Sequence, residues 1–125
     1  MKKSVESPRA PRPVGPYSQA IESEGFVFVS GQLGMDPETG NLADGVEAQA
    51  RLALQNMAAI LEAAGLDMKD VLKVTIFLVD MADFPRVNEV YASFFSEPYP
   101  ARACVAVSGL PKGALVEMEC IAAVD

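Results

Sequence analysis

The sequence contains no histidine, and this absence removes several kinds of chemistry at once. Without imidazole the chain cannot form a Ser-His-Asp or Cys-His arrangement, and it has no histidine ligand for a metal. Any proton transfer must therefore use carboxylates, tyrosine, lysine, cysteine, backbone groups or water.

Cysteine and clustered positive charge are also scarce. The two cysteines, Cys104 and Cys120, lack CxxC spacing, so they indicate neither a zinc site nor a disulfide framework, and we interpret them as reduced thiols. Ten basic residues against 17 acidic ones give a net charge of −7, and the basic residues are scattered. Because affinity for nucleic acid rests on clustered Lys and Arg, this composition predicts no nucleic-acid partner.

The N-terminal region lacks the apolar run of a signal peptide or a membrane span. Lys2 and Lys3 are followed by four prolines within the next thirteen positions, at residues 8, 11, 13 and 16. We therefore expect a cytoplasmic protein that has no membrane partner.

The remaining composition predicts one domain, residues 1–125, that associates with copies of itself. A chain of this length buries roughly two thirds of the surface that its unfolded form exposes. Half of the residues are hydrophobic and only 22% are charged, which is apolar for a small monomer. We expect part of this apolar surface to lie between subunits of a homo-oligomer.

Strand-like runs and helical periodicity follow a proline-rich arm of sixteen residues. The predicted elements are a hairpin over residues 20–30, a helix over 44–64 with a capping box at Asp44 and Glu47, a strand buried on both faces over 71–79, a helix over 83–95, and a hairpin over 100–124. Two helices on one face of a mixed sheet would bury both apolar stripes. The prediction is a two-layer α+β domain whose other sheet face needs a partner.

The last predicted hairpin brings charged residues together. At period two, Arg102 and Cys104 fall on one face of the first strand, and Glu117 and Glu119 fall on one face of the second. A one-residue slip would move each set to the other face. We adopt the antiparallel register that places these four side chains together, because it also matches the apolar faces of the two strands.

Each candidate residue has a functional and a structural interpretation. Arg102 could form an ordinary salt bridge on a strand, or its planar guanidinium could bind a small carboxylate through two parallel hydrogen bonds. Glu117 could be a solvated carboxylate, or it could hold or deprotonate a water molecule. Glu119 and Cys104 are better explained as a structural carboxylate and a small packed thiol.

Several ordered motifs resemble one known family. The matching segments are residues 15–20 (GPYSQA), 29–32 (VSGQ), 36–40 (DPETG), 49–50 (QA), 100–102 (PAR), 110–112 (LPK) and 116–119 (VEME). Together they cover nearly the whole chain and are similar to the RidA/YjgF reactive-intermediate deaminases, a family that is also labelled endoribonuclease L-PSP.

This resemblance implies a fold, an assembly and an activity. The fold is chorismate-mutase-like α+β, with a mixed six-stranded sheet and two helices on one face. The assembly is a barrel-like homotrimer with sites between subunits. The activity is hydrolytic deamination of enamines and imines, such as 2-iminopropanoate and 2-iminobutanoate, to 2-keto acids and ammonia, without a metal or a cofactor.

The resemblance also implies roles for particular residues. Arg102 would clamp the substrate carboxylate, and Glu117 would position the attacking water. The residues that match pocket-lining positions are Tyr17, Ser30, Gly31, Asn88 and Cys104.

Two other functions stay open at this stage. The Arg102 pocket could bind a 2-keto acid or a similar small carboxylate without turnover, as a regulatory module. An endoribonuclease is the third possibility, and the acidic charge and absent histidines argue against it.

Overall fold

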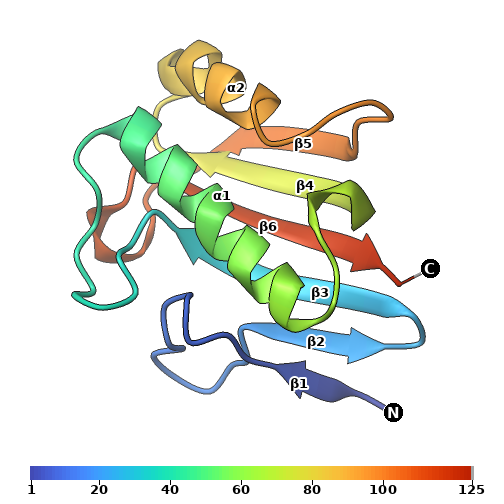
Figure 1. Cartoon of the computed structure of the whole chain (residues 1–125). Coiled ribbons are helices and arrows are strands. Elements are labelled where there is room, and N and C mark those ends of the chain that lie inside the picture. The colour runs from blue at the N-terminus through green and yellow to red at the C-terminus, as the bar shows by residue number, and fades with distance from the viewer. Residues whose placement is uncertain (125) are drawn as a thin grey trace.

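The structure is a computed structural model that describes residues 1–124. Its elements are β1 (Lys3–Val5), β2 (Ala20–Ser23), β3 (Phe26–Leu33), α1 (Val46–Ala63), η1 (Met68–Asp70), β4 (Val71–Leu78), η2 (Met81–Asp83), α2 (Phe84–Ala92), β5 (Ala101–Ala106), η3 (Pro111–Gly113) and β6 (Val116–Ala123). Both α-helices lie on the same face of the sheet (Figure 1).

The sheet has six strands in the order β1-β2-β3-β6-β4-β5. Strands β4 and β5 are parallel, and the other neighbouring pairs are antiparallel. This mixed sheet under two helices confirms the predicted two-layer α+β fold.

The predicted hairpin between the last two strands is wrong. Strand β5 pairs in parallel with β4, where Arg102 lies opposite Val74, and it has no other neighbour in the sheet formed by residues 1–124. Strand β6 lies between β3 and β4 instead. The physical reason is burial, since β6 carries four core side chains and needs a strand on each side, whereas β5 is largely exposed and suits an edge.

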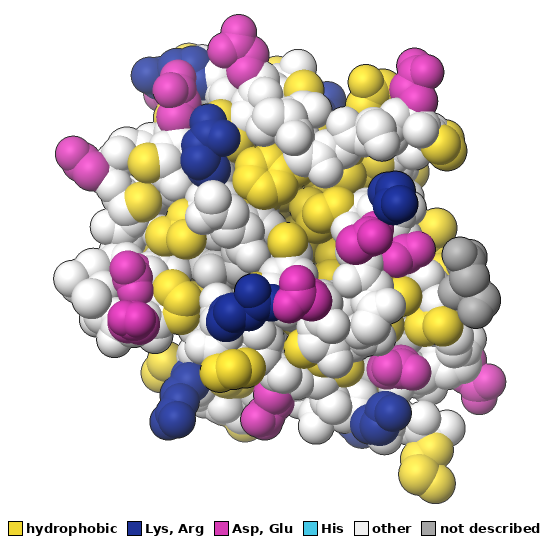
Figure 2. Space-filling view, in the orientation of Figure 1, with side chains coloured by type: hydrophobic (Ala, Val, Ile, Leu, Met, Phe, Trp, Pro, Cys, Tyr) yellow, Lys and Arg dark blue, Asp and Glu magenta, His cyan; other side chains and the backbone are white. Residues whose placement is uncertain are grey.

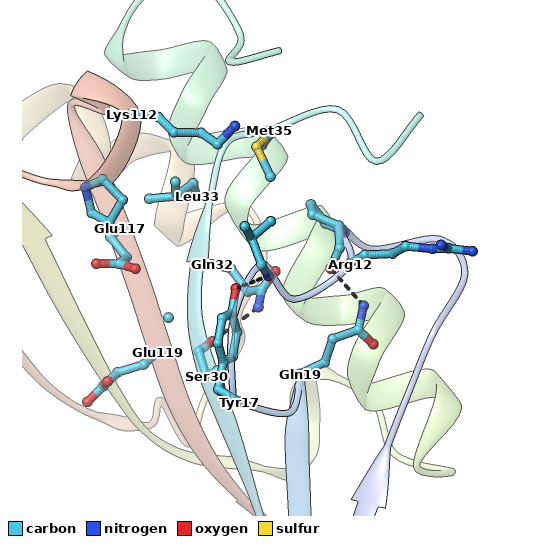
Figure 3. A pocket seen from close by; sticks show the side chains of 14 residues that line it. Arg12, Tyr17, Gln19, Ser30, Gln32, Leu33, Met35, Lys112, Glu117 and Glu119 are labelled. Carbon is cyan, nitrogen blue, oxygen red and sulfur yellow. Dashed lines mark hydrogen bonds between the residues drawn. The ribbon is translucent and has the colours of Figure 1, made fainter. Parts of the chain in front are cut away.

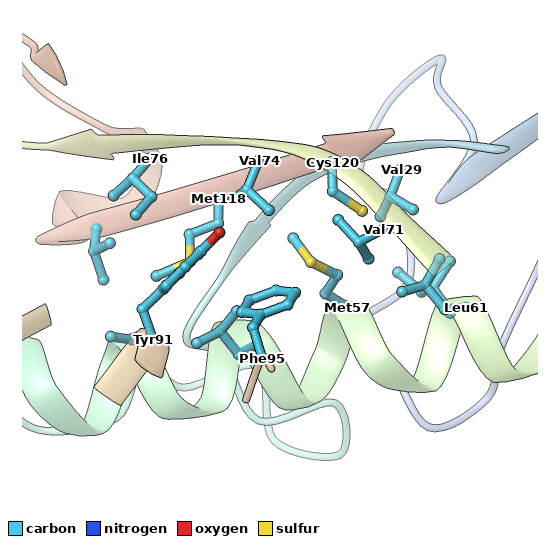
Figure 4. Packing of buried hydrophobic residues seen from close by; sticks show 14 of the residues in the cluster. Val29, Met57, Leu61, Val71, Val74, Ile76, Tyr91, Phe95, Met118 and Cys120 are labelled. Carbon is cyan, nitrogen blue, oxygen red and sulfur yellow. The ribbon is translucent and has the colours of Figure 1, made fainter. Parts of the chain in front are cut away.

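The core fills the space between the helices and one face of the sheet (Figure 4). Leu54, Met57 and Leu61 on α1 are fully buried, at the spacing that predicted the helix. Met118 and Cys120 of β6 face these helix residues. Because side chains alternate along a strand, Glu117 and Glu119 point to the other side of the sheet.

Two local predictions about burial and capping are also wrong. Helix α1 begins after Gly45, whose φ is 89°, and no side chain caps it, so Asp44 and Glu47 form no capping box. The outward face of β4 is partly exposed, because Lys73 is exposed and Thr75 and Phe77 are only partly buried. The predicted end of α1 is confirmed, because Gly65 has φ 79° and Leu66 N–H donates to Leu61 O at 2.9 Å.

The face without helices keeps large apolar side chains in contact with solvent. Phe26, Phe28 and Val105 are 43%, 46% and 44% exposed. On the face drawn in Figure 2, acidic and basic side chains are interspersed among hydrophobic ones. No helix within residues 1–124 has the length and hydrophobicity needed to cross a bilayer.

One close backbone approach fixes α1 against the end of β3. A methyl group on Gly34 would overlap the backbone of Gln49, whereas one on Gly109 would meet open space. We expect Gly34→Ala to lower the free energy of unfolding by about 1–3 kcal/mol, because the helix backbone cannot move aside freely. Urea denaturation at fixed protein concentration measures this effect, and Gly109→Ala is the matched control. Equal stability of the two variants would contradict the prediction.

Candidate active site

A cavity of about 590 Å³ opens where the N-terminal arm, β3 and β6 meet. Its lining includes Tyr17 from the arm, Ser30 and Gly31 from β3, and Glu117 and Glu119 from β6. We call it the Glu117 cavity. Tyr17 comes from the arm side and Glu117 from the β6 side of this cavity (Figure 3).

Gly31 lies in an irregular stretch of β3 and leaves room for the Glu117 carboxylate. The pairing of β3 with β6 shifts between Val29 and Gln32, so Ser30 and Gly31 together stand opposite a single residue of β6. A methyl group on Gly31 would lie 2.5 Å from Glu117 Oε2. Glycine is therefore needed at position 31 for the carboxylate to rest against the β3 backbone.

Ser30 holds the segment that carries Tyr17. Its hydroxyl donates to Ser18 O at 2.6 Å, and its backbone N–H donates to Gln19 O at 2.9 Å. Tyr17 is half-exposed, and its hydroxyl accepts from Val14 N–H at 3.4 Å. The hydroxyl proton of Ser30 is thus engaged within the protein, while the phenol of Tyr17 remains open to the cavity.

The protein environment raises the pKa of the Glu117 carboxyl and so favours its protonated form. Burial raises the pKa of the Glu117 carboxyl above its ordinary value, and the nearby negative charge of Glu119 raises it further. A carboxyl whose pKa is moved toward neutrality can both accept and return a proton under physiological conditions.

A second cavity, of about 430 Å³, surrounds Arg102 between β5 and α2. Arg102 Nη1 donates to Asn88 Oδ1 at 2.7 Å. The guanidinium carbon lies 4.8 Å from the ring centre of Tyr91 and 5.3 Å from that of Phe84. We call this set the Arg102 cage. It fixes the position of the guanidinium and leaves further N–H groups for a ligand.

The two rings of the Arg102 cage were not among the predicted site residues. Phe84, Asn88 and Tyr91 have the i, i+4, i+7 spacing of one helix face. The Tyr91 hydroxyl is buried and has no hydrogen-bond partner within the described residues. The sequence alone indicates that these three residues share one face of α2, but it does not indicate that this face contacts the Arg102 guanidinium.

The predicted placement of Arg102 and Glu117 on one face is wrong. Arg102 lies opposite the fully buried Val74, and therefore on the helix side of the sheet. Glu117 lies opposite Phe77 and points to the side without helices. The fold thus joins Tyr17, Ser30, Gly31 and Glu117 in one cavity, and Arg102 with Asn88 in another.

Cys104 accompanies Arg102 on the helix side of β5. It lies opposite Ile76 and packs against the core. Burial raises the pKa of the Cys104 thiol, and the positive charge of Arg102 opposes this effect only in part. Burial and Glu119 together raise the pKa of Cys120 to about 12. Neither thiol has the depressed pKa of a cysteine nucleophile.

The raised pKa of Glu117 can be tested through its neighbour. Glu119→Gln removes one of the two causes, so we expect the pKa of Glu117 to fall toward its ordinary value. A titration of the side-chain carboxyl by ¹³C NMR measures the change. Glu38→Gln removes one exposed acidic charge outside the cavity lining and is the control. An unchanged Glu117 pKa in the Glu119→Gln protein would contradict the assigned cause.

Comparison with known proteins identifies the family. The sequence model of the protein family described as endoribonuclease L-PSP matches residues 7–124 of this chain. The chain is 51% identical to a RutC family protein of Pyrococcus horikoshii, over 98% of each chain. It is 49% identical to Reactive Intermediate Deaminase A, chloroplastic, of Arabidopsis thaliana, over 97% of this chain and 65% of that protein.

A solved structure gives the same result. Escherichia coli TdcF with bound serine is 45% identical, and the match covers 98% of this chain and 99% of that one with a TM-score of 0.94. The predicted resemblance is thereby confirmed, and the chain belongs to the endoribonuclease L-PSP family, which includes the RidA/YjgF reactive-intermediate deaminases.

Proposed function

We propose that this protein hydrolyses reactive 2-imino acids and their enamine forms to 2-keto acids and ammonia. The substrates that we propose are 2-iminopropanoate and 2-iminobutanoate. The observation that carries the proposal is the Arg102 cage, which presents a fixed guanidinium to a small carboxylate. The names of relatives as reactive intermediate deaminases and the serine bound to E. coli TdcF support it.

Arg102 binds the substrate carboxylate in this proposal. A guanidinium can form two parallel, charge-assisted hydrogen bonds with a carboxylate, and these fix both the position and the plane of the ligand. Asn88 and the two rings hold the guanidinium before the ligand arrives. Less freedom is then lost when the substrate binds. Asn88 therefore acts by positioning Arg102.

Glu117 manages the proton of the attacking water. Its carboxylate accepts that proton while the water oxygen adds to the C2 carbon of the protonated imine, and the π electrons move to nitrogen. The carboxyl then protonates the amine of the resulting carbinolamine. The C2 hydroxyl of the carbinolamine then gives its proton to the Glu117 carboxylate, the C–N bond breaks, and ammonia leaves as the 2-keto acid forms. The raised pKa of Glu117 suits both directions of this transfer.

Groups of the backbone and of the arm complete the site in this proposal. Backbone groups at Gly31 and Cys104 contact the substrate or the water, and Tyr17 and Ser30 line the pocket. An iminium carbon is already electrophilic, so orientation of the substrate and of one water supplies the needed acceleration. The reaction as written uses no metal and no cofactor.

The site is shared between subunits of a homotrimer in this proposal. Arg102 and Glu117 lie on opposite sides of one sheet, so one subunit does not bring them to a common ligand. The exposed Phe26, Phe28 and Val105 provide an apolar face for association. Strand β5 lies at the sheet edge, where a neighbouring subunit can reach it.

The activity is tested by a coupled assay. A serine or threonine dehydratase generates the imine in the presence of a competing nucleophile, and formation of the 2-keto acid is followed. We expect the protein to accelerate this step and Arg102→Ala to lower kcat/KM about a hundredfold or more, because two charge-assisted hydrogen bonds are lost. Arg86→Ala removes an exposed arginine from α2 and is the control.

Each result of this assay has a definite meaning. If the wild-type protein binds 2-oxobutanoate without accelerating hydrolysis, the protein is a carboxylate-binding module and the proposed enzymatic function is wrong. RNA cleavage that is lost in Glu117→Gln would instead support the ribonuclease, against the expectation from a net charge of −7.

Shared sites make a separate prediction. Arg102→Ala and Glu117→Gln proteins should each have little activity alone, since each lacks one of the two proposed residues in every site. When the two are unfolded together and refolded as mixtures, random assembly should restore about a quarter of the sites, because each site takes one residue from each of two subunits. The same treatment of each variant alone is the control. No recovery in fully mixed assemblies would contradict the shared site.

A further inference from the structure

The N-terminal arm between β1 and β2 has few backbone bonds of its own. Prolines at positions 8, 11, 13 and 16 have no N–H to donate. Two backbone hydrogen bonds lie within the arm, Ala10 N–H to Ser7 O at 3.4 Å and Tyr17 N–H to Gly15 O at 2.9 Å. Such a segment needs side-chain contacts to keep one conformation.

Gln19, which immediately precedes β2, supplies those contacts. Its Oε1 accepts from Ser7 N–H at 2.6 Å. Its Nε2 lies within hydrogen-bond distance of three carbonyl oxygens, at 3.1 Å from Ser7, 3.3 Å from Ala10 and 2.8 Å from Pro11. The Gln19 residue is 3% exposed. We call this set of bonds the Gln19 clasp.

Little else ties the arm to the body of the protein through hydrogen bonds. Within residues 1–124, the other such tie from positions 7–16 is the ion pair of Arg9 with Glu62, which lies on the surface. An exposed pair of this kind contributes little to stability. Ala10, at 2% exposed, adds apolar packing beside the clasp.

The segment held by the clasp is one wall of the Glu117 cavity. Pro11, Arg12, Val14 and Tyr17 all line it, and so does Gln19, which Figure 3 shows beside Arg12 and Tyr17. Ser30 fixes the other end of the same segment through Ser18 and Gln19. Tyr17 is therefore held between the Ser30 bonds on one side and the Gln19 clasp on the other.

We propose that Gln19 is a positioning residue, which sets the place of Tyr17 and of the arm wall for the substrate in the Glu117 cavity. This inference rests on the proposed function, and it adds a residue that does not touch the reacting atoms. Glutamine suits the task because one amide both accepts from an N–H and donates to carbonyls. Leucine in its place would leave those backbone groups without partners.

The test is a double-mutant cycle in the imine assay. We expect Gln19→Leu to lower kcat/KM about ten- to a hundredfold, because a small displacement of a positioning group is costly. If Gln19 acts through Tyr17, adding Gln19→Leu to Tyr17→Ala should cost less than about twofold more. Losses that multiply would show that Gln19 acts independently of Tyr17 and would overturn the proposal. Gln19→Asn, which withdraws the amide by one methylene, provides the cycle if Gln19→Leu does not fold.

Two further measurements separate the clasp from general destabilisation and from the proposed function. Trypsin cleavage at the Arg9–Ala10 bond should be slow in the wild-type protein, fast in Gln19→Leu, and slow in the core control Leu61→Ala. Equal cleavage of the two variants would overturn the clasp. If the wild-type protein proves to hydrolyse no imine, the same cycle is measured on the Kd for 2-oxobutanoate, and multiplicative losses there overturn the proposal as well.

Discussion

Strand β6 lies in the middle of the sheet, and its alternation decides where the chemistry of this chain can occur. Val116, Met118, Cys120 and Ala122 must all face the helices to fill the core, so Glu117 must face the other side. Arg102 stands on the edge strand and faces α2. The requirement to bury one face of β6 thus separates the Glu117 carboxylate from the Arg102 guanidinium within one chain. This separation is the physical basis of the proposed shared site.

The structure prepares the two parts of the proposed site, Arg102 and Glu117, in different ways. The Arg102 cage uses two aromatic faces and one amide to fix a cation at the sheet edge. Around Glu117, partial burial and a neighbouring carboxylate raise the pKa, and glycine at position 31 gives the carboxylate its space. A fixed cation can orient an anion, and a carboxyl with a raised pKa can both accept and return a proton. Neither property requires histidine, which the chain lacks.

The features that depend on local sequence patterns could be predicted from the sequence. Helix α1, its end at Gly65 and the two-layer architecture follow from periodicity and from turn residues. The partner of β5 could not be predicted, because this strand is exposed on both sides and its alternation distinguishes no buried face. The short connection to β6 suggested a hairpin, whereas the chain passes over β4. The contact between Phe84 and Arg102 could not be predicted, because it depends on where β5, a separate element, places Arg102 beside α2.

A crystal structure of the protein with bound 2-oxobutanoate would test the shared site most directly. We expect a trimer in which the ligand carboxylate meets Arg102 of one subunit, while the ligand C2 carbon lies beside Glu117 of the next. The cage contacts with Asn88, Phe84 and Tyr91 should persist around the bound guanidinium. A ligand held by Arg102 with no Glu117 from any subunit near its C2 carbon would contradict the shared site and the role of Glu117 in hydrolysis.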